Sequence, residues 1–150
     1  MTRNELIGDD RKAGEILRMI IGIGSDILEV ARFKREIEAD GDNIKHEIFT
    51  SCEIEYCDGK RYPERHYAAR FAAKEAVLKA LATGKEAGIS WRDVEIRNDK
   101  NGQPYIVLFG KAKDIADNLQ AGRILLSLSH TQEWAMANVI LESWMEPVRG

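Results

Sequence analysis

The residues of this chain best suited to chemistry are one carboxylate near the end of an apolar segment and a Glu–Lys pair on a helix. Asp26 comes just after the apolar, glycine-containing segment 19–24. Glu75 and Lys79 are four residues apart in a run of strong helix formers, so they share one helix face. Proteins usually hold Mg²⁺ with one or two carboxylates together with waters and substrate phosphates. If Asp26 meets Glu75, the pair suits metal-assisted phosphoryl transfer, with Lys79 neutralising developing negative charge.

Ordinary structural roles also explain these residues. Asp26 suits the cap of a following helix, and Glu75 with Lys79 is a helical ion pair in its favourable orientation, worth only about 0.3–0.5 kcal/mol. Spacing alone favours these roles over a metal site. The helix is nevertheless apolar or small almost all round from residue 71 to 82, which predicts that it is largely buried and that its charged groups need partners.

The composition excludes several classes of protein. The 150 residues are 44% hydrophobic and 31% charged, which is typical of a single globular domain. A net charge of −3 argues against nucleic-acid binding. No apolar run approaches the roughly 18 residues of a membrane span, and no secretory signal is recognisable. We therefore expect a cytoplasmic protein with neither nucleic-acid nor membrane partners. The cysteines, Cys52 and Cys57, lack zinc-site spacing and are expected to be structural thiols.

The elements that position the candidate residues follow an α+β order. Residues 1–18 are polar and charged and are expected to form an N-terminal extension, which leaves 19–150 as a single domain. Thr50 and Glu53 fit a capping box, and Asn101-Gly102 fits a hairpin turn. We expect strands over 19–24, 94–97, 105–108, 124–129 and 134–141, and helices over 29–39, 50–56, 66–82 and 111–119. The predicted fold is an antiparallel sheet packed against the long central helix.

Two further groups of residues are candidates for binding. Helix 29–39 carries Arg32, Lys34 and Arg35 on its polar faces, where pairing with nearby glutamates in solvent is the ordinary role. His130 ends a strand pattern, where a hydrogen-bonded histidine is the ordinary role. Neither pattern by itself indicates a ligand.

Four short blocks of sequence, taken together, resemble one enzyme family. The blocks are Gly22-Ile-Gly-Ser-Asp-Ile27 with Arg32, Arg70-Phe-Ala-Ala-Lys-Glu-Ala76 with Lys79, Ser90-Trp-Arg-Asp-Val-Glu-Ile96, and Ser127-Leu-Ser-His130. In order and spacing, from about residue 19 to 141, they resemble holo-acyl-carrier-protein synthase. The resemblance implies transfer of 4′-phosphopantetheine from coenzyme A to a serine of apo-acyl carrier protein, with Mg²⁺, in fatty acid biosynthesis. Adenosine 3′,5′-bisphosphate is the product released.

The same resemblance assigns roles to individual residues. Asp26 and Glu75 become the Mg²⁺ ligands, and either Glu75 or a metal-bound water takes the serine proton. Lys79 lies against the pyrophosphate and stabilises or protonates the leaving group. Further contacts to coenzyme A are implied for Arg70, Lys74 and His130.

The resemblance also implies partners and an assembly. Arg32 and Arg35 would bind the acidic recognition helix of the carrier protein, with salt-sensitive association. The fold would be that of a short 4′-phosphopantetheinyl transferase, which forms a homotrimer with active sites between subunits.

Two other functions fit the residues. One is a noncatalytic binding module with the same fold, in which Asp26 is a cap and Glu75 pairs with Lys79. The other is a phosphotransferase that uses a nucleotide, although the chain has no Gly-x-x-x-x-Gly-Lys-Ser/Thr loop.

Overall fold

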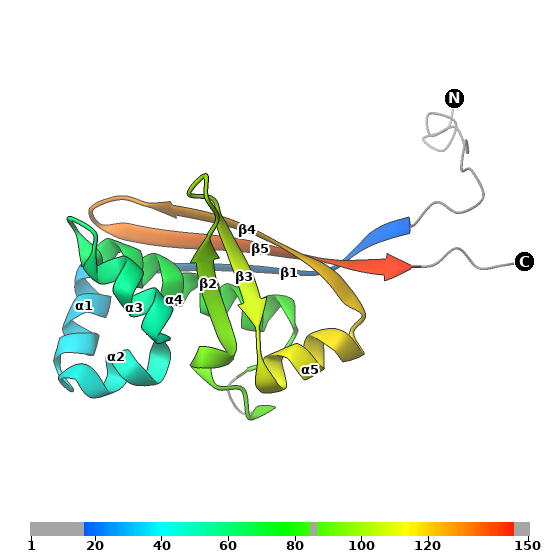
Figure 1. Cartoon of the computed structure of the whole chain (residues 1–150), viewed down its shortest axis with the longest axis horizontal. Coiled ribbons are helices and arrows are strands. Elements are labelled where there is room, and N and C mark those ends of the chain that lie inside the picture. Colours follow the sequence, from blue (N-terminus) through cyan, green and yellow to red (C-terminus); the bar gives the residue numbers. More distant parts are fainter. Residues whose placement is uncertain (1–16, 85–86, 146–150) are drawn as a thin grey trace, which may run out of the picture.

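The chain is an α+β fold in which a long first strand is followed by a run of helices, a β-hairpin, a further helix and two long strands (Figure 1). The computed structural model describes residues 17–84 and 87–145. The elements are β1 (Leu17–Glu29), α1 (Val30–Glu38), α2 (Asp42–Ile48), α3 (Ser51–Asp58), α4 (Pro63–Ala80), the 3₁₀ turn η2 (Trp91–Asp93), β2 (Val94–Asn98), β3 (Pro104–Leu108), α5 (Gly110–Asn118), β4 (Ala121–His130) and β5 (Trp134–Met145).

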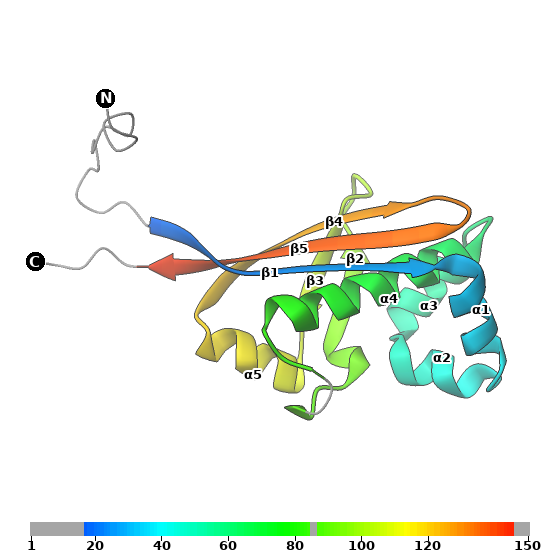
Figure 2. The ribbon, with the colours of Figure 1, turned by 180° about the vertical axis from the view of Figure 1, so that it is seen from behind.

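The main sheet has three antiparallel strands in the order β1-β5-β4, and α4 lies along one of its faces (Figure 2). Backbone contact sets how closely helix and sheet approach. A Cβ atom added at Gly24 would lie 1.8 Å from the carbonyl oxygen of Ala76, and one at Gly22 would lie 2.2 Å from that of Ala80. Since side chains alternate along a strand, Asp26 is on the same face as these glycines. The strand therefore directs its carboxylate toward α4.

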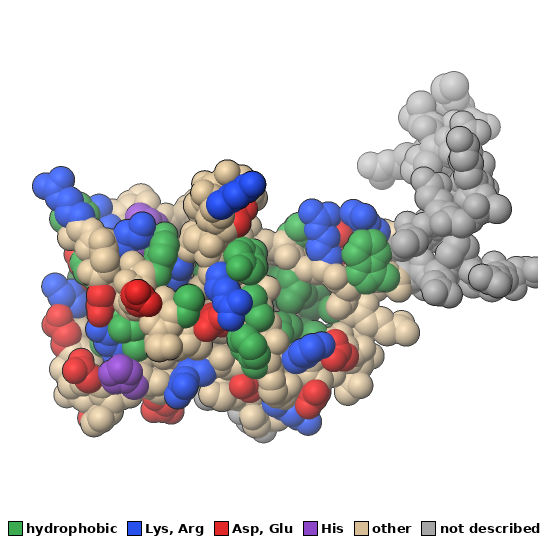
Figure 3. Space-filling view, viewed as in Figure 1, with side chains coloured by type: hydrophobic (Ala, Val, Ile, Leu, Met, Phe, Trp, Pro, Cys, Tyr) green, Lys and Arg blue, Asp and Glu red, His purple; other side chains and the backbone are tan. Residues whose placement is uncertain are grey.

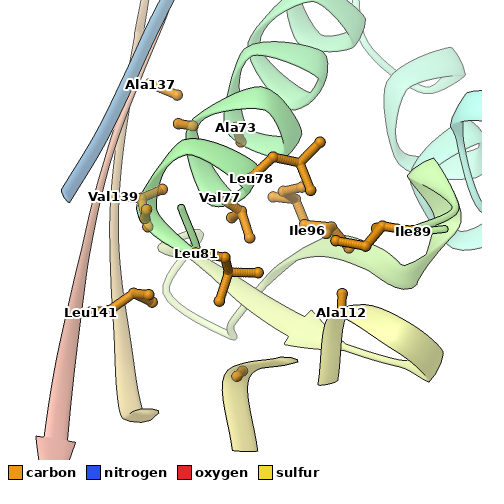
Figure 4. Packing of buried hydrophobic residues seen from close by; sticks show 14 of the residues in the cluster. Ala73, Val77, Leu78, Leu81, Ile89, Ile96, Ala112, Ala137, Val139 and Leu141 are labelled. Atoms are coloured by element: carbon orange, nitrogen blue, oxygen red, sulfur yellow. The ribbon is translucent and has the colours of Figure 1, made fainter. Parts of the chain in front are cut away.

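The main hydrophobic core lies between α4, the sheet β1-β5-β4, and the smaller sheet β2-β3 with α5 (Figure 4). Fully burying a Val, Leu or Ile side chain contributes about 1.5–3 kcal/mol each. The core includes Val77, Leu78, Leu81, Ile89, Ile96, Ala112, Val139 and Leu141. A second cluster joins α1 to α4, where Phe33 stacks on Phe71 with ring centroids 4.8 Å apart.

Most predicted elements are confirmed, including the long central helix, the β2–β3 hairpin and the capping box of Thr50 and Glu53. The first strand is longer than predicted, because it begins at Leu17 and continues to Glu29. Two residues assigned to the N-terminal extension thus belong to β1, and the rest of that extension, 1–16, lies outside the described residues. Helix α2 was not predicted, and the strands form two sheets rather than one. Of the helices described, none has the length and apolar character needed to cross a membrane.

The C-terminal end of α4 places a non-glycine residue in the left-handed region. Ala82 has φ 52°, and the Thr83 and Ala82 amides donate to the carbonyl oxygens of Leu78 and Lys79, both at 3.0 Å. This is a Schellman cap, in which glycine is the favoured residue. A residue with a Cβ atom costs about 1–2 kcal/mol in this conformation. Glycine avoids that cost, but its greater freedom in the unfolded chain offsets part of the gain in stability.

We expect Ala82→Gly to raise the free energy of unfolding by about 0.5–1 kcal/mol, measured by urea denaturation. The control is Ala31→Gly in α1, which only adds backbone freedom and should lower it. A loss of stability in Ala82→Gly equal to that in the control would contradict this account of the cap.

Candidate active site

Asp26 of β1 and Lys79 of α4 meet at the protein surface. The Lys79 ammonium donates to Asp26 Oδ1 at 3.1 Å and to the Ser25 carbonyl oxygen at 2.8 Å. The Asp26 side chain is 19% exposed. Both residues line a shallow pocket of about 190 Å³ with Ile27 and Met136. The fold thus places a cation and a carboxylate, 53 residues apart in sequence, at one solvent-accessible point.

Glu75 adds a second carboxylate beside this pair. Burial raises the pKa of Glu75, the Asp26 carboxylate raises that pKa further, and the Lys79 ammonium opposes both effects. No described residue donates a hydrogen bond to the Glu75 carboxylate. Two neighbouring carboxylates, one of them half-buried and without a donor, favour an additional positive charge. Asp26 and Glu75 are therefore candidate ligands for a cation.

The structural roles considered for these residues are not the ones they adopt. Asp26 lies within β1, and the residue before α1 is Glu29, whose side chain makes no capping hydrogen bond. Within the described residues, the ion pair of Lys79 is with Asp26 and not with Glu75. The features on which the noncatalytic alternative depended are therefore absent from this part of the chain.

The donor set at this site matches a hard divalent cation that retains several waters. In the described part of the chain, no group of three or more His, Cys, Asp or Glu residues could enclose a metal ion. Asp26 and Glu75 together could still hold Mg²⁺ in the manner usual for phosphate chemistry, with one or two carboxylates and oxygens from water and substrate.

Lys74 was predicted to contact coenzyme A, and the structure places it elsewhere. Its side chain is fully buried, and its ammonium donates to Glu53 Oε1 at 2.7 Å, to the Trp91 carbonyl oxygen at 3.1 Å and to the Val94 carbonyl oxygen. These acceptors use all three of its N–H donors. Lys74 therefore stabilises the core, and the prediction that it contacts coenzyme A is wrong.

Arg70 lies at a second cluster, formed by α3, α4 and the end of β2. Its guanidinium is 3.8 Å from the centroid of the Tyr56 ring and donates to Asn98 Oδ1 at 2.6 Å. The residue is 2% exposed, and its Nε has no hydrogen-bond partner among the described residues. The Lys60 ammonium is 4.4 Å from the centroid of the same tyrosine ring. The cluster is thus rich in positive charge.

His130 joins this cluster from the end of β4. Its ring packs against that of His66, with centroids 5.0 Å apart. Burial and the positive charges of His130, Lys60, Arg70 and Arg65 lower the pKa of His66 to about 4. Sequence analysis missed His66 and Tyr56, although the spacing of four between His66 and Arg70 shows that they share a helix face.

The carboxylate site and the positive cluster lie on different sides of α4. Nine residues separate His66 from Glu75, and nine separate Arg70 from Lys79. At 100° per residue, each pair points about 180° apart. Their strand partners also differ, because Asp26 is on β1 and His130 is on β4, with β5 between them. One chain therefore presents two separate groups of candidate residues.

Comparison with known proteins identifies the family. The model of the 4′-phosphopantetheinyl transferase superfamily matches residues 22–139, so the chain belongs to that superfamily. A holo-(acyl-carrier-protein) synthase of Geobacter sp. (strain M21) is 47% identical over 124 residues, which are 83% of this chain and 99% of that relative. The resemblance found in the four sequence blocks is thereby confirmed.

Solved structures agree with this assignment. The holo-(acyl-carrier-protein) synthase of Neisseria meningitidis superposes with a TM-score of 0.75 and 31% identity, covering 82% of this chain and 98% of that one. The Bacillus anthracis synthase, crystallised in complex with CoA (3′,5′-ADP), superposes with a TM-score of 0.67 and 36% identity, covering 83% of this chain and 98% of that one.

The buried position of Lys74 leads to a stability prediction. Lys74→Met leaves the Glu53 carboxylate buried without its cation, so we expect the free energy of unfolding to fall by about 3–5 kcal/mol, measured by urea denaturation. The control is Lys113→Met, because Lys113 forms an ion pair with Asp117 at 2.8 Å on the exposed face of α5. That change should cost less than about 1 kcal/mol. Equal losses in the two variants would contradict the core role of Lys74.

Proposed function

We propose that this chain is a holo-acyl-carrier-protein synthase that transfers 4′-phosphopantetheine from coenzyme A to a serine of apo-acyl carrier protein, in support of fatty acid biosynthesis. The observation that carries the proposal is the meeting of Asp26, Glu75 and Lys79, from β1 and α4, at one surface site. The close relationship to proteins named as such synthases supports it. A cytoplasmic location remains a prediction from the sequence.

Asp26 and Glu75 are the residues we propose for binding Mg²⁺. The raised pKa of Glu75 supports this, because a cation would relieve the repulsion between the two carboxylates. Bound Mg²⁺ would supply positive charge that polarises the attacked phosphorus and offsets the charge of the pyrophosphate. The residues of the chain position the reacting groups and handle the proton.

The reaction is a phosphoryl-group displacement. The oxygen of the carrier serine forms a bond to the phosphorus on the pantetheine side of the coenzyme A pyrophosphate. The bond from that phosphorus to the bridging oxygen breaks, and adenosine 3′,5′-bisphosphate leaves with the electron pair. Either Glu75 or a water held at the site would accept the serine proton. Lys79 then stabilises the negative charge on the leaving phosphate.

Coenzyme A is proposed to bind between subunits of a homotrimer. Lys79 is on the carboxylate side of α4, whereas His130 is on the other side beside Arg70, which is 2% exposed, so one copy does not present Lys79 and His130 to the same phosphates. Two adjacent copies can do so if the carboxylate site of one faces the positive cluster of the next. The sheet face away from α4 supports assembly, because it exposes apolar side chains such as Ile23, Ile27 and Met136, which are 69%, 60% and 39% exposed.

The carrier protein is proposed to dock on α1 through Arg32 and Arg35. Arg32 is exposed and pairs with Glu36 at 3.0 Å, and Lys34 lies 3.9 Å from Glu38. Charges of both signs are interspersed over this end of the molecule (Figure 3). Long-range attraction of an acidic partner is therefore weaker than the basic residues alone indicated. A pocket of about 290 Å³ lined by Arg32, Phe33, Phe71 and Trp134 offers apolar contact beside these arginines.

The proposed function is tested by the intact mass of apo-acyl carrier protein after incubation with this protein, coenzyme A and Mg²⁺. We expect the carrier to gain the mass of one phosphopantetheine group, and EDTA to abolish the gain. No gain with carriers from several bacteria would refute the activity. A gain that survives EDTA would refute only the role of the metal.

Glu75→Gln should keep the fold but lose most of the activity. The amide cannot accept the serine proton and is a poor cation ligand, so we expect kcat to fall by about 100-fold or more. Thermal stability should not fall, since no described residue donates to the Glu75 carboxylate. The control is Glu47→Gln on the exposed surface of α2. Unchanged turnover in Glu75→Gln would contradict the proposed mechanism.

Arg32→Ala should weaken docking of the carrier rather than chemistry. Loss of one charge at the rim of an interface predicts a rise of about fivefold in the KM for the carrier protein, with kcat and the KM for coenzyme A within about twofold. Raising the salt concentration should narrow the difference. Lys113→Ala, on the distant helix α5, is the control and should leave all three constants unchanged. A fall confined to kcat in Arg32→Ala would contradict the docking role.

A further inference from the structure

Three aromatic rings from three different elements pack in sequence beside the positive cluster. Tyr56 comes from α3, His66 from the first turns of α4, and His130 from the last position of β4. The rings of Tyr56 and His66 have centroids 5.9 Å apart at 74°, and those of His66 and His130 have centroids 5.0 Å apart at 67°. Both contacts are edge-to-face, an arrangement preferred by aromatic pairs. His66 is therefore the central ring and the link between helix and strand.

Basic groups face His66 from the elements around it. Arg65 and Arg70 belong to α4, Lys60 follows α3, and His130 ends β4. The half-buried imidazole of His66 is kept in its neutral form by these charges and by burial, which lower its pKa to about 4. At neutral pH the cluster thus contains the cations of Lys60, Arg65 and Arg70 together with the uncharged ring of His66. That ring contributes packing rather than charge.

His130 depends on such packing because no described residue forms a side-chain hydrogen bond or ion pair with it. It is exposed, and the turn that leads to β5 follows directly. An unrestrained side chain at a strand end samples several rotamers, and fixing one of them on binding reduces affinity. A ring packed against the imidazole removes part of that cost before the ligand arrives.

We propose that His66 is a positioning residue for His130, and that its ring holds the His130 imidazole in the orientation that contacts the coenzyme A phosphates. The inference rests on the proposed function, which assigns His130 to coenzyme A. His66 makes no contact with substrate in this scheme. Its effect is on the binding of coenzyme A, and the carrier protein and the carboxylate site are unaffected.

The first test distinguishes the packing of the His66 ring from the chemistry of its imidazole nitrogens. His66→Ala removes the ring, whereas His66→Phe keeps an uncharged ring of similar size in the same place. We expect His66→Ala to raise the KM for coenzyme A about fivefold, the effect of losing one aromatic pair, with kcat and the KM for the carrier protein within about twofold. His66→Phe should restore the KM for coenzyme A. The control is His46→Ala, which removes an exposed histidine from α2 and should change none of these constants.

The second test observes His130 directly in the full chain without ligand. In an NMR spectrum, the ring protons of His130 should carry a ring-current shift from the neighbouring ring. That shift should be kept in His66→Phe and lost in His66→Ala. This measurement depends on packing alone and not on activity.

The outcomes are distinguishable. If the wild-type protein is active and His66→Ala leaves the KM for coenzyme A unchanged, this inference is overturned and the proposed function stands. Equal rises in both KM values, or a failure of His66→Phe to restore the KM for coenzyme A, would also overturn it. A wild-type protein that neither binds coenzyme A by calorimetry nor modifies any carrier would overturn the proposed function and this inference together.

Discussion

The Lys74 ammonium and the Glu53 carboxylate face each other in the core at 2.7 Å, with both side chains fully buried. Removing two charges from water costs several kcal/mol per ion, and this cost is recovered only where the remaining donors and acceptors are also satisfied. Here they are. Lys74 has two backbone acceptors besides Glu53, and Glu53 accepts from the amides of Thr50 and Ile96 at 3.1 and 3.2 Å. The pair thus ties α4 to the start of α3, to η2 and to β2.

The orientation of α4 about its own axis depends on this pair. Because Lys74 must point into the core between α3 and β2, its neighbour Glu75 is rotated by about 100° from that direction, toward the side where β1 lies. Lys79, four residues further on, shares that side. His66 and Arg70 point to the opposite side, beside α3 and β4. With Lys74 held in this direction, the candidate side chains on the two sides of the helix are directed to β1 and to β4.

Sequence reasoning succeeded where local rules decide the structure. The hairpin, the capping box and the long alanine-rich helix have local signals. Spacing alone favoured structural roles for Asp26, Glu75 and Lys79, and only the resemblance of the four sequence blocks placed them in one site. Reasoning failed for Lys74, because a lysine beside the key glutamate looks equally suited to phosphate, and only three-dimensional packing shows that it is buried. Helix α2 was missed because its seven residues carry one buried apolar side chain, too few for a periodic pattern. The cluster around His66 combines α3, α4 and β4, whose proximity no spacing predicts.

The contact between the two glycines of β1 and the carbonyl oxygens of α4 has a consequence for how this protein can lose its activity. The separation between Asp26 and the Glu75 and Lys79 side chains is set by the absence of atoms at residues 22 and 24. A single methyl group at residue 24 would overlap the backbone at Ala76, and relief would require the helix to move away from the strand. Every charged group would remain in place in the sequence, yet Asp26 would lie farther from the Glu75 and Lys79 side chains. Gly22 and Gly24, which have no side chains, thus determine the spacing between the charged groups of β1 and α4.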